Sequence, residues 1–232
     1  MRQLPLGVRL NDSAVFETYS PGPNEEAVSF LERMAIGAAD SGAWLWGISG
    51  SGKTHLLQAA CRAAESGARS AGYLPMDRLA KHGPGVLEGW HDRDLVALDS
   101  VESVTGNPGF ETALFKLFND LHASGGRLLI ATQCPPANLP IKLADLKSRL
   151  AWGVIYQLER LDDNQCVSAL KLRARHRGLE MPDATARYLM RRLPRDIATL
   201  CDWLDRLDIA SLAAQRRLTV PFVRDVLNTE AE

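Results

Sequence analysis

The sequence predicts an α/β fold in which a parallel sheet carries helices on both faces and a small all-helical domain follows. Three observations support this prediction. A glycine-rich phosphate-loop pattern follows a short apolar run, apolar runs then alternate with helical stretches as far as about residue 158, and only helical patterns come after it. Short buried strands that alternate with helices are typical of parallel sheets covered on both faces.

The first part of the chain supplies the alternating elements. The first two dozen residues are predicted to be irregular and to end in a Pro-Gly-Pro-Asn turn at 21–24, after which Glu25 and Glu26 favour a helix start. Helices are expected near 25–39, 54–65, 109–123 and 142–150. Strands are expected at 43–47, 72–76, 94–99, 127–132 and 153–158.

The second part of the chain shows helical patterns alone. Asp162 and Asp163 can cap a helix that runs to about 177, and Pro182 opens another that runs to 193. Two further helices are expected at 194–213 and 219–227. The predicted organisation is an N-terminal segment at 1–23, a nucleotide-binding α/β domain at 24–158 and a helical domain at 159–232.

The phosphate-loop pattern predicts a nucleotide site. Its pattern is Gly-x-x-x-x-Gly-Lys-Thr, and its residues are Gly47, Ile48, Ser49, Gly50, Ser51, Gly52, Lys53 and Thr54, with His55 following in the helix that the loop opens. The glycines let backbone N–H groups close around phosphates, and the N-terminus of the helix favours the bound anion. Lys53 is expected to reach the β- and γ-phosphates of ADP or ATP, and the Thr54 hydroxyl to ligate Mg²⁺.

A second motif completes the predicted site. The apolar run 94–99 ends in Asp99, which is expected to hold the Mg²⁺ shell beside Thr54. Ser100 follows at a position where many ATPases have an acid that orients the attacking water, and a serine cannot act as that base at neutral pH. Glu102 is nearby but displaced. The sequence therefore predicts nucleotide binding with little or no unaided hydrolysis.

Composition excludes several other classes of protein. The net charge of −1 over 232 residues provides no overall basic field to hold nucleic acid. The four cysteines are far apart, as expected for reduced thiols and not for a metal site or a disulfide framework. No apolar run is long enough to span a membrane and no signal peptide is evident, so a cytoplasmic location is expected.

With these motifs placed, the chain resembles the AAA+ ATPases, and within them the DnaA-related branch. The residues that carry the resemblance are the segments 21–24, 47–57, 131–136, 146–153 and 218–223. The resemblance implies an AAA+ fold whose C-terminal helices form a lid. It also implies that Arg149 is an arginine finger, that Arg195 is the sensor-2 arginine of the lid, and that Gln133 stands at the sensor-1 position, where relatives often have an acid.

The two ends of the chain extend the resemblance. Gln3, Leu4, Pro5 and Leu6 resemble the short peptide that docks on the bacterial sliding clamp, the β subunit of DNA polymerase III. The sequence stops at 232, where the lid ends, so no DNA-reading domain and no sequence-specific DNA binding are expected. Together these features imply a regulator that docks on the DNA-loaded clamp and stimulates ATP hydrolysis by the initiator DnaA, which prevents re-initiation of chromosome replication.

Other interpretations stay open at this point. The peptide 3–6 could be a plain terminal segment, and Arg149 and Arg195 could be ordinary solvated arginines. The chain could instead be a self-contained P-loop ATPase or an AAA+ protein of the helicase-loader type, and it could form a homo-oligomer. The serine at position 100 argues against the first of these alternatives, and the near-neutral charge argues against the second.

Overall fold

The structure is a computed structural model that describes residues 14–150, 152–194 and 196–229. The predicted clamp peptide at 3–6 and the predicted sensor residue Arg195 lie outside the described residues. The chain divides into two compact units. One consists of Pro23–Glu159 with the described residues before Glu17, and the other of Glu17–Gly22 with the helical region that begins at Arg160.

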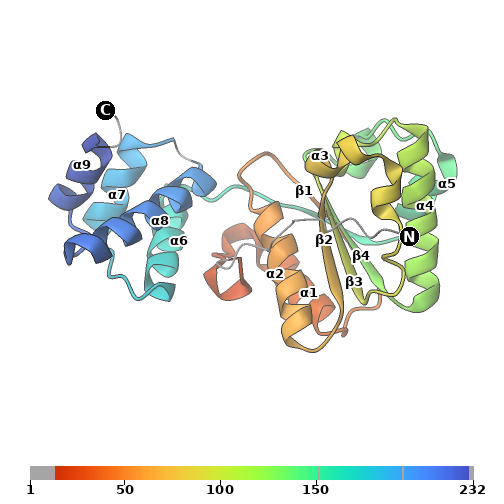
Figure 1. Ribbon diagram of the computed structural model, residues 1–232, viewed down its shortest axis with the longest axis horizontal. Coiled ribbons are helices and arrows are strands. Elements are labelled where there is room, and N and C mark those ends of the chain that lie inside the picture. The colour runs from red at the N-terminus through yellow and green to blue at the C-terminus, as the bar shows by residue number, and fades with distance from the viewer. Residues whose placement is uncertain (1–13, 151, 195, 230–232) are drawn as a thin grey trace. The chain divides into compact units, whose positions relative to one another are not determined.

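The first unit is built around a parallel sheet of five strands, as the sequence predicts (Figure 1). In space the strands follow the order β2-β3-β4-β1-β5, and every neighbouring pair is parallel. Their bounds are β1 (Ala43–Trp46), β2 (Ala71–Pro75), β3 (Leu95–Asp99), β4 (Arg127–Thr132) and β5 (Val154–Gln157). Because all strands run in one direction, the loops that follow β1, β3 and β4 gather at one edge of the sheet.

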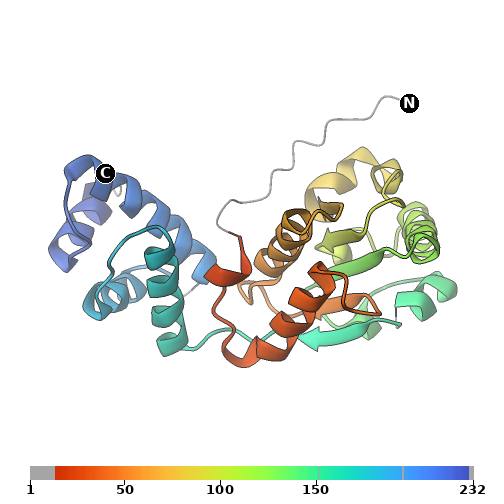
Figure 2. The same cartoon turned by 90° about the horizontal axis from the view of Figure 1, so that it is seen from below.

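Helices cover both faces of this sheet. Helices α1 (Glu25–Ala35) and α2 (Lys53–Ser66) lie side by side on one face, as Figures 1 and 2 show. The other face is covered by α3 (Met76–Leu79), α4 (Pro108–Ser124) and α5 (Ala144–Leu150). All five residues of β3 are buried, and the first four form an uninterrupted apolar run that ends in Asp99.

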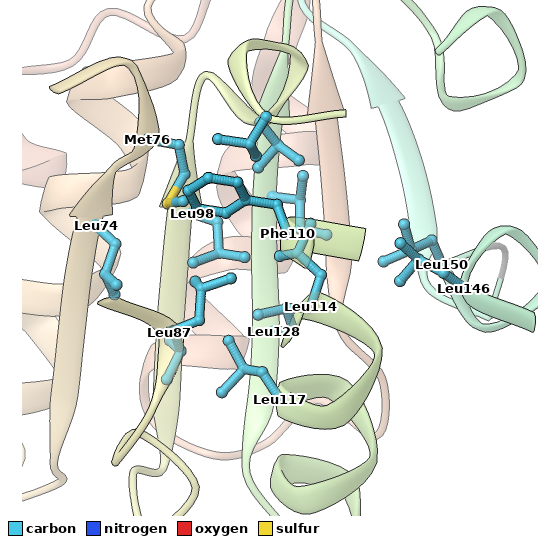
Figure 3. Close-up of a cluster of buried hydrophobic side chains, with 14 of the residues drawn as sticks. Leu74, Met76, Leu87, Leu98, Phe110, Leu114, Leu117, Leu128, Leu146 and Leu150 are labelled. Carbon is cyan, nitrogen blue, oxygen red and sulfur yellow. The ribbon is translucent and has the colours of Figure 1, made fainter. Parts of the chain in front are cut away.

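The packing between α4 and the sheet shows why this region folds as it does (Figure 3). Phe110, Leu114 and Leu117 follow one another at spacings of four and three residues, so they share one face of α4. That face packs on Leu98 of β3 and Leu128 of β4. Each fully buried leucine contributes about 1.5–3 kcal/mol relative to an exposed one, so this layer holds the strands that end in the predicted site.

The described part of the second unit contains four α-helices and its own apolar cluster. They are α6 (Asp163–His176), α7 (Asp183–Arg192), α8 (Ile197–Ala214) and α9 (Val220–Thr229). Asp162 caps α6 as predicted, and Gln165 completes a capping box by accepting the Asp162 backbone N–H. Residues 17–22, predicted to belong to an N-terminal segment, group with this unit, and a Cβ at Gly22 would lie 2.9 Å from the Leu161 side chain.

Some boundaries differ from the prediction for identifiable reasons. Helix α1 ends at Ala35 and not near 39. Gly37 adopts a φ of 81°, which ends the helical conformation, and the Arg69 guanidinium donates hydrogen bonds to the carbonyl oxygens of Met34 and Ala35. Short 3-10 helices, which the sequence did not reveal, occur at Phe16–Thr18, Gly22–Asn24, Ala80–His82, Pro84–Leu87, Val101–Ser103 and Pro136–Asn138. None of the described helices is long and apolar enough to cross a membrane.

A buried carboxylate fixes the start of α5. The Glu111 side chain on α4 accepts the backbone N–H groups of Gly106, Lys142 and Leu143 at 2.8–3.1 Å. Burial alone would raise the pKa of Glu111, but these hydrogen bonds outweigh it and lower that pKa. The helix begins at Ala144 and not at 142 as predicted, and Glu111 holds the two residues that precede it.

Candidate nucleotide-binding site

The phosphate loop connects β1 to α2 and requires glycine at defined points. A Cβ at Gly47 would lie 2.4 Å from the carbonyl oxygen of Leu158, so no other residue fits there without a shift of the backbone. Gly52 caps α2 with a φ of 90°, a conformation that side chains rarely adopt. The loop therefore keeps a tight curve that places the N-terminus of α2 at its open side.

The Lys53 ammonium lies over this loop. Its Nζ donates to the carbonyl oxygens of Gly47 at 2.5 Å and Ile48 at 3.0 Å. These contacts hold the charge beside the curve in which phosphate oxygens are expected. His55, one residue beyond Thr54, has its Nε2 2.9 Å from the carbonyl oxygen of Val15, so its ring ties the described N-terminal residues to α2.

The structure brings Thr54 and Asp99 together across 45 residues of sequence. The Thr54 hydroxyl donates to Asp99 Oδ2 at 2.7 Å. A hydroxyl and a carboxylate in contact suit Mg²⁺, which prefers oxygen ligands and usually takes one or two protein groups together with phosphate oxygens. Thr54 and Asp99 would hold the ion, whose charge would offset that of the phosphates.

Tyr73 is a partner of Asp99 that sequence reasoning missed. Its hydroxyl donates to the same Oδ2 atom at 2.8 Å. Burial, and then the Asp99 charge, raise the pKa of Tyr73, so its phenol keeps the proton that it donates. Strand β2 pairs with β3, and this neighbour relation is the signal that could have pointed to Tyr73, but no residue pattern in the chain predicts it.

Replacing Tyr73 by phenylalanine is expected to weaken nucleotide binding only when Mg²⁺ is present. The Asp99 oxygen loses one of two donors, a loss of about 1–2 kcal/mol, or roughly tenfold in affinity. Calorimetric titration with ADP measures this in Mg²⁺ and again in a chelator. An equal loss under both conditions would mean that Tyr73 supports the fold of the loop and not the metal carboxylate.

The loop after β4 contributes at the same edge of the sheet. Thr132 is fully buried and its hydroxyl is already engaged, because it donates to the Cys134 carbonyl and accepts the Trp44 indole N–H, both at 2.7 Å. It therefore anchors the loop. Gln133 follows with an exposed side chain at the predicted sensor-1 position.

The loop after β3 turns sharply at position 100, where this chain has a serine and many ATPases have an acid. Ser100 adopts a φ of 56°, and a one-turn 3-10 helix, Val101–Ser103, follows it. This turn brings Glu102 toward Lys53 and Asp99, whose charges both act on its carboxyl. Burial raises the pKa of Glu102 and Asp99 adds to the rise, while Lys53 and the backbone N–H groups of Glu102 and Gln133 oppose it.

Arg149 lies at a different edge of the sheet. It lies in the last turn of α5, and its guanidinium carbon lies 4.2 Å from the ring centre of Trp152, which has 54% of its surface exposed. Trp152 precedes β5, whose first residue pairs with Ala43 at the start of β1, whereas the phosphate loop follows the end of β1. At ~3.3 Å a residue, the length of β1 separates the two edges by on the order of 10 Å.

A cavity of about 130 Å³ lies beside Trp152 at that opposite edge. Trp44, Phe118 and His122 contribute to its lining, and the rings of Phe118 and His122 both lie close to 6 Å from that of Trp152. Among the residues that the structure describes, none of those predicted to bind nucleotide lines it. This cavity is therefore not the nucleotide site.

Comparison with known proteins identifies the relatives of both units. Residues 85–157 match the family model of the bacterial DnaA ATPase domain, and residues 162–227 match that of the Hda lid domain. The chain is similar in structure to domain III of the replication initiation protein DnaA from Thermotoga maritima. The TM-score is 0.76 and the identity 22%, over 96% of this chain and 98% of that one.

Two other solved structures are similar. AMPPCP-bound DnaA from Aquifex aeolicus gives a TM-score of 0.69 at 22% identity, over 86% of this chain and 66% of that one. The Holliday junction branch migration motor RuvB from Thermotoga maritima gives 0.64 at 16% identity, over 92% and 73%. These likenesses confirm the predicted AAA+ fold. Residues 85–157 are therefore similar to the ATPase domain of bacterial DnaA, and residues 162–227 are similar to the lid domain of Hda.

Proposed function

We propose that the chain is a nucleotide-dependent regulator that promotes ATP hydrolysis by DnaA and so prevents re-initiation of chromosome replication. The observation that carries this proposal is the presence of a DnaA-type ATPase region and an Hda-type lid in the same chain. DnaA-related AAA+ proteins share one fold, so a relative can present complementary edges to DnaA itself.

The first part of the proposal is that ADP or ATP binds with Mg²⁺ at the phosphate loop. It is supported by the position of Lys53 over the loop and by the contact between Thr54 and Asp99. The related DnaA of Aquifex aeolicus has been solved with AMPPCP, a nucleotide analogue. Nucleotide roles for His55, Gln133 and Arg195 stay predictions within this proposal.

The second part is that Arg149 acts on the nucleotide of DnaA and not on the chain's own. Its place at the edge opposite the phosphate loop supports action in trans. A guanidinium can form two parallel hydrogen bonds with a phosphoryl group, which suits it to stabilise the charge of the transition state.

The third part is that Gln3, Leu4, Pro5 and Leu6 dock on the DNA-loaded sliding clamp. A short extended segment can place two leucines in an apolar groove while a glutamine side chain forms hydrogen bonds at its rim. Whether the chain also forms a homo-oligomer stays a separate prediction.

Changing both Gln3 and Leu4 to alanine is expected to abolish retention of the chain by immobilised clamp. The thermal melting temperature is expected to stay the same, since the first residues of a domain usually contribute little to its stability. The matched control changes Val8 and Arg9, just beyond the peptide, to alanine. Undiminished retention of the Gln3 and Leu4 variant would place the clamp interface elsewhere on the chain.

One assay tests the proposal as a whole. ATP-bound DnaA is incubated with clamp loaded on DNA, with and without the chain, and the fraction of ADP on DnaA is measured. The proposal expects conversion only when the clamp, DNA and chain are all present. Rapid steady-state hydrolysis by the chain alone would instead favour a self-contained ATPase.

A further inference from the structure

One carboxylate oxygen of Glu102, Oε2, is buried without a hydrogen-bond partner among the described residues. Buried polar atoms nearly always have partners, and an exception marks a site where water, an ion or a substrate completes the bonding. A carboxylate oxygen only accepts hydrogen bonds, so its partner is a hydrogen-bond donor or a cation.

The surroundings of Glu102 favour a water molecule, because the cation expected here is assigned to Thr54 and Asp99, which are in contact. The carboxyl lies within electrostatic range of Lys53 and Asp99, the groups expected at the phosphates and the metal, and next to the Gln133 backbone on the neighbouring loop. A phosphate oxygen carries no hydrogen to donate and is negatively charged, so it cannot satisfy a carboxylate. A water molecule beside the terminal phosphate can.

The turn at Ser100 positions the Glu102 carboxyl near Lys53 and Asp99. Ser100 holds a left-handed conformation that residues other than glycine adopt at a cost of about 1–2 kcal/mol, and such strain concentrates at functional sites. The 3-10 helix that follows is closed by hydrogen bonds from the N–H groups of Ser103 and Val104. After this turn, the Glu102 carboxyl lies where the charges of Lys53 and Asp99 act on it.

We propose that Glu102 is a catalytic residue that orients and deprotonates the water attacking ATP in the chain's own site. This inference rests on the proposed binding of nucleotide at the phosphate loop. The chain is then a slow ATPase as well as a regulator, and its own turnover leaves ADP in the site.

The step balances as a hydrolysis. The water oxygen forms a bond to the γ-phosphorus, and the bond from that phosphorus to the oxygen shared with the β-phosphate breaks. The water proton passes to the Glu102 carboxylate, and ADP and inorganic phosphate are the products. The rate is low because Arg149, the predicted arginine finger, lies at the opposite edge and does not reach the chain's own site; such a group is worth roughly 10³–10⁵ in rate in related reactions.

A single-turnover experiment with the full chain tests this inference. Protein in excess over radiolabelled ATP and Mg²⁺ is sampled over hours, and the nucleotide that stays bound is identified by chromatography. Glu102→Gln keeps the shape of the side chain but cannot take the proton. We expect it to retain ATP where the wild type retains ADP, with a hydrolysis rate lower by on the order of 10²-fold. The matched control is Glu88→Gln, an exposed glutamate outside the site, which should behave as wild type.

The outcomes separate this inference from the proposed function. Binding of ADP and of ATP is measured first by calorimetry for all three proteins. Absence of binding by the wild type would contradict the nucleotide site itself. Binding without hydrolysis by the wild type, or equal rates for the wild type and Glu102→Gln, would overturn the role of Glu102 and leave the regulator proposal standing.

Discussion

Replacing Lys53 by alanine lowers the affinity for ADP by at least 10²-fold, the first of the two largest effects that we expect. The Lys53 Nζ atom lies 2.5 Å from the Gly47 carbonyl oxygen, directly over the loop. A charge-assisted hydrogen bond contributes about 1.5–3 kcal/mol, and the ammonium faces two phosphates, so a loss of ~3 kcal/mol is expected. Isothermal calorimetry with ADP in Mg²⁺ measures it.

The matched control for Lys53→Ala is Lys116→Ala. Lys116 is an exposed lysine of α4, far along the chain from the phosphate loop, and its removal is expected to leave the affinity unchanged. Thermal melting of both variants without nucleotide separates a binding defect from unfolding. Equal ADP affinity for Lys53→Ala and the wild type would show that the loop 47–54 is not the phosphate site.

Much of the fold could be predicted because it depends on local patterns. The strands β3 and β4 are buried on both faces and therefore appear as short apolar runs in the sequence. The phosphate loop could be located in the sequence because its glycines form a contiguous motif. One reason for a glycine is that Gly47 lies too close to the Leu158 carbonyl oxygen to carry a Cβ. Helix ends were predicted less well where distant groups decide them, as Arg69 does for α1.

The candidate site could be predicted in part for the same reason. Lys53 and Thr54 belong to a contiguous motif, and Asp99 ends a recognisable strand. Tyr73 and Glu102 could not be assigned, because their roles depend on which strands are neighbours and on the turn at Ser100. Sequence order alone does not reveal that β2 pairs with β3, nor that the charges of Lys53 and Asp99 act on the Glu102 carboxyl.

Replacing Arg149 by alanine is expected to abolish stimulation of DnaA while leaving the chain's own ligands bound. The residue lies at the end of α5 with its guanidinium stacked on the exposed Trp152 ring. This contact orients the planar group at the surface, where a neighbouring molecule can reach it. Arginine fingers supplied in trans are worth roughly 10³–10⁵ in rate in other phosphoryl-transfer systems, so conversion of ATP–DnaA should fall to its unstimulated rate.

Lysine at position 149 separates charge from geometry. Arg149→Lys keeps a positive charge near Trp152 but lacks the planar pair of donors that can bind two phosphoryl oxygens at once. We therefore expect it to fail almost as completely as Arg149→Ala, although both variants bind ADP and the clamp normally.

The control is Arg93→Ala, which removes an exposed arginine of the same unit. The ADP fraction on DnaA after incubation with clamp-loaded DNA decides the matter. Full conversion by Arg149→Ala would exclude a finger role, whereas activity of the lysine variant alone would mean that Arg149 contributes only its charge.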